Sequence, residues 1–311
     1  MASLDQQGVL VITGPTASGK SSLAMALAEE LGGEIVTADS AQVYRGMDIG
    51  TAKPDAESQS KVKHHLIDIR DPAEPYSAAD FREDAISVVR DIQARGALPI
   101  LAGGTMLYLK ALKEGLATLP PADQSIRDEI TREAEQHGWP HLHSELSKVD
   151  PEAAARIKPM DSQRLQRALE VYRISGRPLS SHHEDATDSC PFPLLEIAIM
   201  PPDRSLLHKE IEARFLHMLD QGFVDEVRQL KENPHLHVGL PAIRAVGYRQ
   251  IWSYLEEEIN EQSMIETAVA ATRQLAKRQF TWLRGWQDLH IMDQPDMAEA
   301  LKIINNTTIL E

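Results

Sequence analysis

Eight consecutive residues near the start of the chain have the types and spacing that bind phosphate. They match the pattern G-x-x-x-x-G-K-[ST] in full and are Gly14, Pro15, Thr16, Ala17, Ser18, Gly19, Lys20 and Ser21. In such a loop the glycines let backbone N–H groups converge on phosphate oxygens, Lys20 supplies a cation, and the Ser21 hydroxyl can bind Mg²⁺. The pattern predicts a diphosphate or nucleotide site with Mg²⁺ as cofactor.

A carboxylate, Asp39, is expected near the same phosphates. It directly follows an apolar run over residues 35–38, and ligands of open α/β sheets bind beyond the carboxyl ends of the strands. Another apolar run, over residues 98–102, ends without a carboxylate, although an ATPase or kinase of this type commonly has an aspartate for Mg²⁺ there. The loop therefore indicates phosphate but not specifically a nucleoside triphosphate. The alternative for Asp39 is a cap or turn former.

These residues need a sheet and helices to position them. Apolar runs over residues 8–13, 35–38, 98–102 and 194–199, with a further short one over 66–69, alternate with helical patterns. This alternation predicts an α/β fold: a P-loop NTPase-like core with a parallel sheet flanked by helices. The helix after the P-loop should end at Gly32, and Ser77 with Asp80 has the spacing of a capping box that opens another helix.

The middle of the chain has a different pattern. From residue 115 to 190 helical segments follow one another without a convincing strand, with Asp150 and Asp161 as expected helix caps. We therefore predict an α/β core from residues 1–114 and 191–311 and an all-helical insertion domain over 115–190. Helical segments are also expected from about residues 203, 241 and 263.

Composition limits the classes of function. A net charge of −15 excludes a chain coated uniformly with basic residues, so any nucleic-acid site must be local. The single cysteine, Cys190, excludes internal disulfides and a zinc site of clustered thiolates. Because no apolar stretch has the roughly 20 residues of a membrane span, a cytoplasmic protein without membrane contact is expected.

Five segments in order carry a family resemblance. They are the P-loop with residues 39–54, then 103–108, 161–177, 244–249 and 273–284. Together they resemble the tRNA dimethylallyltransferases, also called tRNA isopentenyltransferases, over nearly the whole chain. The resemblance implies transfer of a dimethylallyl group from dimethylallyl diphosphate to N6 of adenosine 37 of tRNA, next to the anticodon. The P-loop would then hold the diphosphate that leaves.

The resemblance also implies roles for individual residues. Asp39 matches the family's general base, Thr105 a threonine near the same site, and Arg127 an arginine close to the reacting groups. Lys20 and Mg²⁺ near Ser21 would stabilise the charge on the departing diphosphate. From the residues alone, Thr105 could equally be a helix cap and Arg127 an exposed helix residue.

By resemblance, four segments contact tRNA. They are Asp39, Ser40, Ala41 and Gln42; Gln163, Arg164, Leu165, Gln166 and Arg167; Arg244, Ala245, Val246, Gly247, Tyr248 and Arg249; and Lys277, Arg278, Gln279, Phe280, Thr281, Trp282, Leu283 and Arg284. Glutamines in these segments could read base edges and Trp282 could stack on a base. The plainer interpretations are solvated helix faces for the basic clusters and a core position for Trp282.

The expected partners are the tRNA anticodon stem-loop and dimethylallyl diphosphate, with the chain acting as a monomer. The target base lies in a stacked loop, so it must be extruded before it can react. Two other functions fit the P-loop: a small-molecule or nucleoside kinase that uses ATP, and a non-catalytic tRNA-binding protein that uses the loop as a switch.

Overall fold

The computed structural model describes residues 8–117, 119–182 and 189–307. The chain divides into two compact units, which are Met1–Lys113 with Cys190–Glu311, and Glu114–Ser189. The first unit is an α/β core and the second is built of helices.

The described part of the core contains a six-stranded sheet in the order β3-β2-β4-β1-β5-β6. The strands are β1 (Val9–Thr13), β2 (Gly33–Thr37), β3 (His64–His65), β4 (Leu98–Gly103), β5 (Leu194–Ile199) and β6 (Leu289–Met292). All neighbouring pairs are parallel, which confirms the predicted sheet. In β1, Thr13 is in register with Gly103 and Ala198, so the P-loop leaves the sheet between two neighbouring strand ends.

Two strands differ from the expectation. The prediction of a strand over residues 66–69 is wrong, because β3 ends at His65. Leu66 and Asp68 have left-handed φ angles of 61° and 56°, which interrupt an extended backbone. Strand β6 was not predicted, because it is short and the side chains of its two central residues are exposed, so it lacks an apolar run.

Helices cover both faces of this sheet. Those before the insertion are α1 (Lys20–Leu31), α2 (Ala56–Lys61), α3 (Ala78–Ala94) and α4 (Met106–Glu114). Leu10 and Ile12 of β1 pack with α1 and the last helix, α14 (Met297–Asn306), on one face. Val9 and Val11 pack on the other face with α3 and with the helices that lie between β5 and β6. The predicted capping box of α3 is present, with Ser77 and Asp80 bonding each other's backbone N–H. The helix α1 ends at Leu31 and is capped by Gly32, whose φ is 65°.

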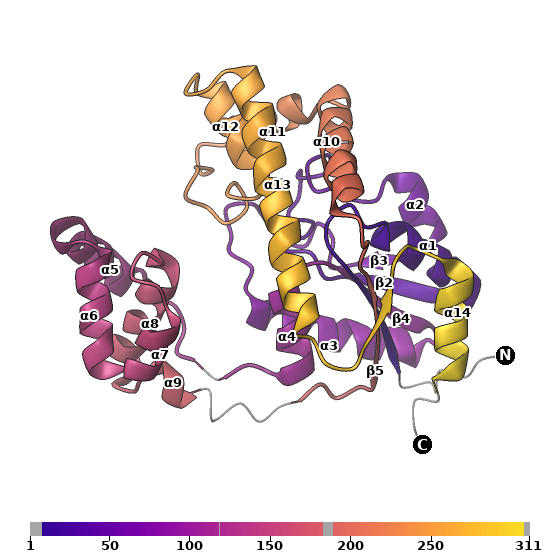
Figure 1. The fold of residues 1–311 in the computed structure, drawn as a ribbon, viewed down its shortest axis with the longest axis horizontal. Coiled ribbons are helices and arrows are strands. Elements are labelled where there is room, and N and C mark those ends of the chain that lie inside the picture. The colour runs from indigo at the N-terminus through magenta and orange to yellow at the C-terminus, as the bar shows by residue number, and fades with distance from the viewer. Residues whose placement is uncertain (1–7, 118, 183–188, 308–311) are drawn as a thin grey trace. The chain divides into compact units, whose positions relative to one another are not determined.

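The chain after β5 forms α10 (Arg204–Asp220), α11 (Phe223–Lys231), α12 (Tyr248–Leu255), α13 (Glu261–Arg284) and α14 (Met297–Asn306). In Figure 1, α10 and α13 run side by side, and their residues share one core cluster with the sheet. The helix expected from about residue 241 is present as α12 but starts later, because residues 241–247 form turns and α12 begins only at Tyr248. Gly247, with a φ of 92°, ends this turn segment.

The second unit contains α5 (Gln124–His137), α6 (Trp139–Val149), α7 (Pro151–Arg156), α8 (Ser162–Ser175) and α9 (Leu179–His182). It has its own hydrophobic core, which includes Ile130, Leu142, Leu146 and Leu165. Asp150 and Asp161 cap α7 and α8 as predicted.

In the part of the chain that is described, no helix combines the length and the apolar character that crossing a membrane requires.

Candidate active site

The P-loop connects β1 to α1 in a conformation that brings backbone close to backbone. A side chain at Gly14 is excluded, because a Cβ there would lie 2.6 Å from the carbonyl oxygen of Ile199 on β5. Gly19, with a φ of 84°, precedes α1 and offers no side-chain cap. The first N–H groups of α1 therefore have no cap competing with an anion. Ser18 adds a buried hydroxyl for which no hydrogen-bond partner is found among the described residues.

Lys20 is the loop's cation and lies in a crowded environment. Burial lowers the pKa of Lys20 from 10.5 to about 8, although the negative charge of Asp39 opposes this and the positive charge of Arg214 adds to it. Its Nζ donates to the carbonyl oxygen of Pro15, 3.3 Å away. An anion bound beside Lys20 would favour the charged form and so would be bound more tightly by it.

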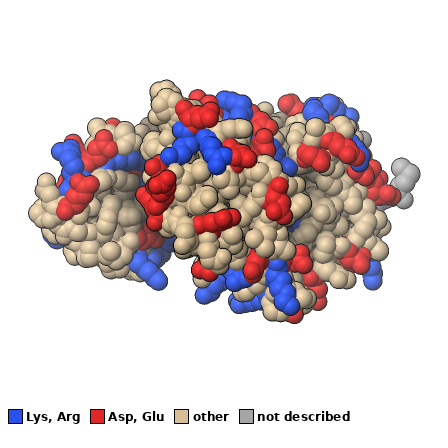
Figure 2. Space-filling model, turned by 90° about the horizontal axis from the view of Figure 1, so that it is seen from above, with Lys and Arg blue, Asp and Glu red and all other residues tan. Residues whose placement is uncertain are grey.

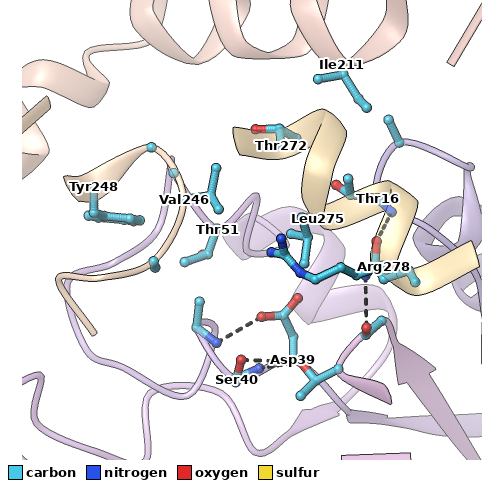
Figure 3. Close-up of a pocket in the computed structure, with 18 of the residues that line it drawn as sticks. Thr16, Asp39, Ser40, Thr51, Ile211, Val246, Tyr248, Thr272, Leu275 and Arg278 are labelled. Carbon is cyan, nitrogen blue, oxygen red and sulfur yellow. Dashed lines mark hydrogen bonds between the residues drawn. The ribbon is translucent and has the colours of Figure 1, made fainter. Parts of the chain in front are cut away.

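Two cavities adjoin this loop, and they meet. One, of about 460 Å³, is lined by P-loop residues including Lys20 and Ser21. The other, of about 440 Å³, has a largely apolar lining that includes Ile211 and Phe223. The residues that line both are Thr16, Ala17, Asp39, Thr51, Arg214, Met218, Leu275 and Gln279. Figure 3 shows the convergence: Thr272 and Leu275 come from α13, Ile211 from α10, and Asp39 and Ser40 from the loop after β2.

Asp39 lies where these two cavities join. It follows β2, which is separated from β1 by β4 in the sheet. One carboxylate oxygen, Oδ1, accepts a hydrogen bond of 2.9 Å from the backbone N–H of Ala41. The charge of Asp39 also acts on Lys20 and Arg214, where it opposes the lowering of each pKa by burial. The structure thus brings the strand-end carboxylate to the phosphate loop.

Thr105 joins two loops of the site. Its hydroxyl oxygen accepts from the backbone N–H of Ser40 at 3.0 Å, and the hydroxyl donates to Ser40 Oγ at 3.3 Å. The approach of these loops requires Gly103, because a Cβ there would lie 2.1 Å from the carbonyl oxygen of Ala38. Thr105 therefore holds the segment beside Asp39, and it also lines the apolar cavity.

Arg214 is a site residue that sequence reasoning missed. It lies on α10, lines both cavities, and has its pKa lowered by burial while the charge of Asp39 opposes that shift. A signal was present in the sequence: Ile211, Phe215 and Met218 surround it at helical spacing, which places a cation on the apolar face of a helix. Burying a cation in an apolar environment costs free energy unless an anion pairs with it.

Arg127 belongs to the helical unit, where its guanidinium binds a fully buried carboxylate. Nε and Nη2 of Arg127 donate to Glu170 at 2.8 Å and 3.3 Å, and Nη1 of Arg167 donates to the same carboxylate at 2.7 Å. Glu170 also accepts from the backbone N–H of Asp123. Arg127 is thus held in place within its unit rather than being an unattached surface residue, and its role near the reacting groups stays a prediction.

Several residues of the segments expected to contact tRNA are core residues instead. Leu165, Phe280 and Leu283 lie in hydrophobic clusters, so burial of their side chains explains their apolar character. Tyr248 is buried as well, and its hydroxyl donates to Glu226 at 2.6 Å. Tyr248 nevertheless lines the apolar cavity, as do several of its neighbours in these segments.

Those neighbours include exposed cations and cavity-lining groups. Arg244, Arg249, Lys277, Arg278 and Arg284 are exposed. Arg244, Arg278 and Val246 line the apolar cavity together with Trp282, which is 39% exposed. A core position for Trp282 is thus wrong, whereas Trp286 donates to Glu196 and packs against the core. Figure 2 shows basic side chains in patches interspersed with acidic ones rather than on one uniformly basic face.

In the helical unit, the segment from Gln163 to Arg167 lies in the first turns of α8. Gln163 and Arg164 are exposed. The amide of Gln166 donates to the carbonyl oxygen of Arg127 and to Thr131 Oγ1, so it is occupied within the unit.

The fold and the site define a class of protein: a P-loop α/β protein whose phosphate pocket opens into an apolar cavity beside a strand-end carboxylate. The family model described as IPP transferase matches residues 42–286, and the chain belongs to this family.

Solved structures agree over most of the chain. A full-length tRNA isopentenylpyrophosphate transferase from Bacillus halodurans is 36% identical, with 96% of this chain and 95% of that one covered and a TM-score of 0.69. A tRNA delta(2)-isopentenylpyrophosphate transferase from Staphylococcus epidermidis is 32% identical, with coverages of 96% and 99% and a TM-score of 0.69. A eukaryotic dimethylallyltransferase acting on tRNA is 27% identical, with coverages of 94% and 75% and a TM-score of 0.78. The family resemblance seen in the sequence is confirmed.

Proposed function

We propose that this enzyme transfers a dimethylallyl group from dimethylallyl diphosphate to N6 of adenosine 37 of tRNA and releases diphosphate. Its family and its structural neighbours are tRNA isopentenyl and dimethylallyl transferases, which makes it a tRNA-modifying prenyltransferase. The observation that carries the finer proposal is the junction of a polar and an apolar cavity at Asp39 and Arg214. We assign the diphosphate to the first cavity, and the allylic chain with the adenine base to the second.

Charge on the leaving diphosphate is the main feature that the site must stabilise. As the C–O bond breaks, the electron pair stays on the diphosphate oxygen. The positive groups available for this are the N–H groups at the start of α1, which have no side-chain cap, and Lys20 and Arg214, which line the polar cavity. Preorganised groups of this kind stabilise developing charge without reorganising during the reaction.

The site also fits Mg²⁺. The Ser21 hydroxyl lines the polar cavity and offers a hard oxygen ligand of the kind that this ion takes. No cluster of three or more His, Cys, Asp or Glu side chains suited to a metal is found among the described residues. When bound, Mg²⁺ would neutralise diphosphate charge.

Asp39 is proposed as the general base. The lone pair of the adenine amine is delocalised into the ring, so removal of its proton during C–N bond formation helps the attack. The proton passes from N6 to the Asp39 carboxylate while the allylic carbon exchanges its C–O bond for the C–N bond. The Ala41 N–H holds Oδ1, which orients the carboxylate. Thr105 keeps the adjoining segment in place through Ser40.

The proposed macromolecular partner is the anticodon stem-loop. An extruded base can enter the apolar cavity, at which Trp282 offers an aromatic face and Arg244 and Arg278 offer cations for the flanking phosphates. Separate basic patches would suffice for this because binding then depends on where the cations lie rather than on net charge. We also propose that the enzyme is a monomer and acts in the cytoplasm.

The test is incorporation of labelled dimethylallyl diphosphate into unmodified tRNA with Mg²⁺, beside a parallel assay with labelled ATP. We expect label on the adenosine next to the anticodon and none from ATP. Asp39→Ala should lose nearly all prenyl transfer with little change in tRNA affinity, and Asp91→Ala, an exposed aspartate of α3, serves as the control. Label from ATP on a small acceptor with tRNA untouched would overturn the proposal. Full activity of Asp39→Ala would remove Asp39 as the base.

A further inference from the structure

Gln279 of α13 connects the two loops that form the phosphate end of the site. Its Oε1 accepts from the backbone N–H of Thr16 in the P-loop at 2.9 Å. Its Nε2 donates to the carbonyl oxygen of Gly104, after β4, also at 2.9 Å. Figure 3 marks the bond at Thr16 with a dashed line. These partners are 263 and 175 residues away in the sequence.

The three segments meet without space for another atom. A Cβ on Gly104 would lie 2.4 Å from Nε2 of Gln279 and 3.2 Å from the carbonyl oxygen of Gly14. It would also approach Cε of Lys20 to 3.5 Å. The Gln279 amide thus packs directly against Gly104, and Gly104 in turn lies beside the P-loop backbone and the Lys20 side chain.

The chemistry of this junction requires an amide. One end must accept from an N–H and the other must donate to a carbonyl, and a glutamine is the side chain of this length that does both. Gln279 is only 6% exposed, so an unpaired end would cost the desolvation of a buried polar group. Both ends are occupied within the protein. This geometry does not suit the role in reading base edges that the resemblance suggested.

We propose that Gln279 is a positioning residue for the diphosphate, not a tRNA-reading residue. It fixes the direction of the Thr16 amide and holds the P-loop against α13, so that the two cavities keep their alignment at Asp39. Its place in the lining of both cavities supports this. The proposal rests on the proposed function for its substrate, but its test begins with the binding of inorganic pyrophosphate, which needs no prenyl transfer.

Two variants separate the two roles. Gln279→Met keeps the length but removes both hydrogen bonds, and Gln279→Glu keeps an acceptor for Thr16 while losing the donor to Gly104. The matched controls are Gln274→Met and Gln274→Glu, at an exposed position of the same helix. Calorimetry measures the Kd of Mg²⁺-pyrophosphate and of an anticodon stem-loop RNA. Circular dichroism and thermal unfolding identify the variants that are folded.

We expect Gln279→Met to raise the pyrophosphate Kd about tenfold, the effect of losing one to two net hydrogen bonds, with RNA Kd within twofold of wild type. The loss in prenyl transfer should appear in kcat and in KM for the isoprenoid diphosphate, and not in KM for tRNA. An unchanged pyrophosphate Kd in either folded variant, or a tenfold weaker RNA Kd, would overturn the proposal. If wild type binds pyrophosphate but does not prenylate tRNA, the proposed function fails while the positioning role is still decided by the pyrophosphate data.

Discussion

The hydrogen bonds of Glu226 lead to a prediction about the wall of the cavity. Its carboxylate accepts from the backbone N–H groups of Asp48 at 2.9 Å, Ile49 at 2.6 Å and Gly50 at 3.2 Å, and from the Tyr248 hydroxyl at 2.6 Å. Glu226 comes from α11, whereas residues 48–50 follow the loop that starts at Asp39. A helix distant in sequence therefore holds the loop that lines both cavities.

The magnitude follows from this bonding. In Glu226→Gln, one carboxylate oxygen becomes an NH₂ group that faces N–H donors, so at least one backbone N–H loses its acceptor and the negative charge is removed. Hydrogen bonds to a charged group contribute about 1.5–3 kcal/mol each, and a stranded donor costs a further part of this. We expect the free energy of unfolding to fall by about 2–4 kcal/mol. The pKa of Tyr248, which burial and the charge of Glu226 both raise, should fall in the variant.

The assay is urea unfolding followed by circular dichroism, with Glu232→Gln as control. Glu232 is exposed and caps the carboxyl end of the same helix. KM for dimethylallyl diphosphate should also rise in Glu226→Gln, because residues 49 and 51 line the polar cavity. A loss of stability no greater than that of the control would refute the reasoning, since the carboxylate would then contribute nothing to holding the loop.

Two more predictions concern charge. Arg214→Gln removes a cation that lines both cavities. We expect kcat to fall about 10²–10³-fold, as when a group that stabilises the transition state is lost. Steady-state kinetics that give a kcat within threefold of wild type would contradict this. For Glu34, burial raises the pKa, but hydrogen bonds from Arg95 and His65 outweigh it and lower the pKa from 4.5 to about 2. Its stabilisation is thus present above pH 4.5 and lost as the pH falls from there towards 2. Glu34→Gln should lower the free energy of unfolding by about 1 kcal/mol at pH 7, after solvent screening, and by less at pH 3. Urea denaturation that shows the same loss at both pH values would count against a stabilising ion pair between Glu34 and its partners.

Local patterns were sufficient for much of the fold. The P-loop, the capping box at Ser77 and the caps at Asp150 and Asp161 were predicted because each depends on residues within a few positions of one another. The parallel sheet followed from apolar runs that alternate with helices. β6 was missed because two exposed residues interrupt its short pattern. The start of α12 was predicted too early, at about residue 241, because helical propensity does not reveal the turns that end at Gly247.

The site shows the same division. The sequence by itself determined a phosphate loop, a carboxylate at a strand end and a family, since these depend on residue types at fixed spacing. Only the tertiary structure decided that Arg214 joins Asp39 at the meeting of two cavities and that Gln279 connects the loops after β1 and β4. The physical reason is that the partners of these side chains lie many residues away in the sequence. The role of a buried polar group depends on the groups that it contacts, and residue spacing along the chain does not reveal those contacts.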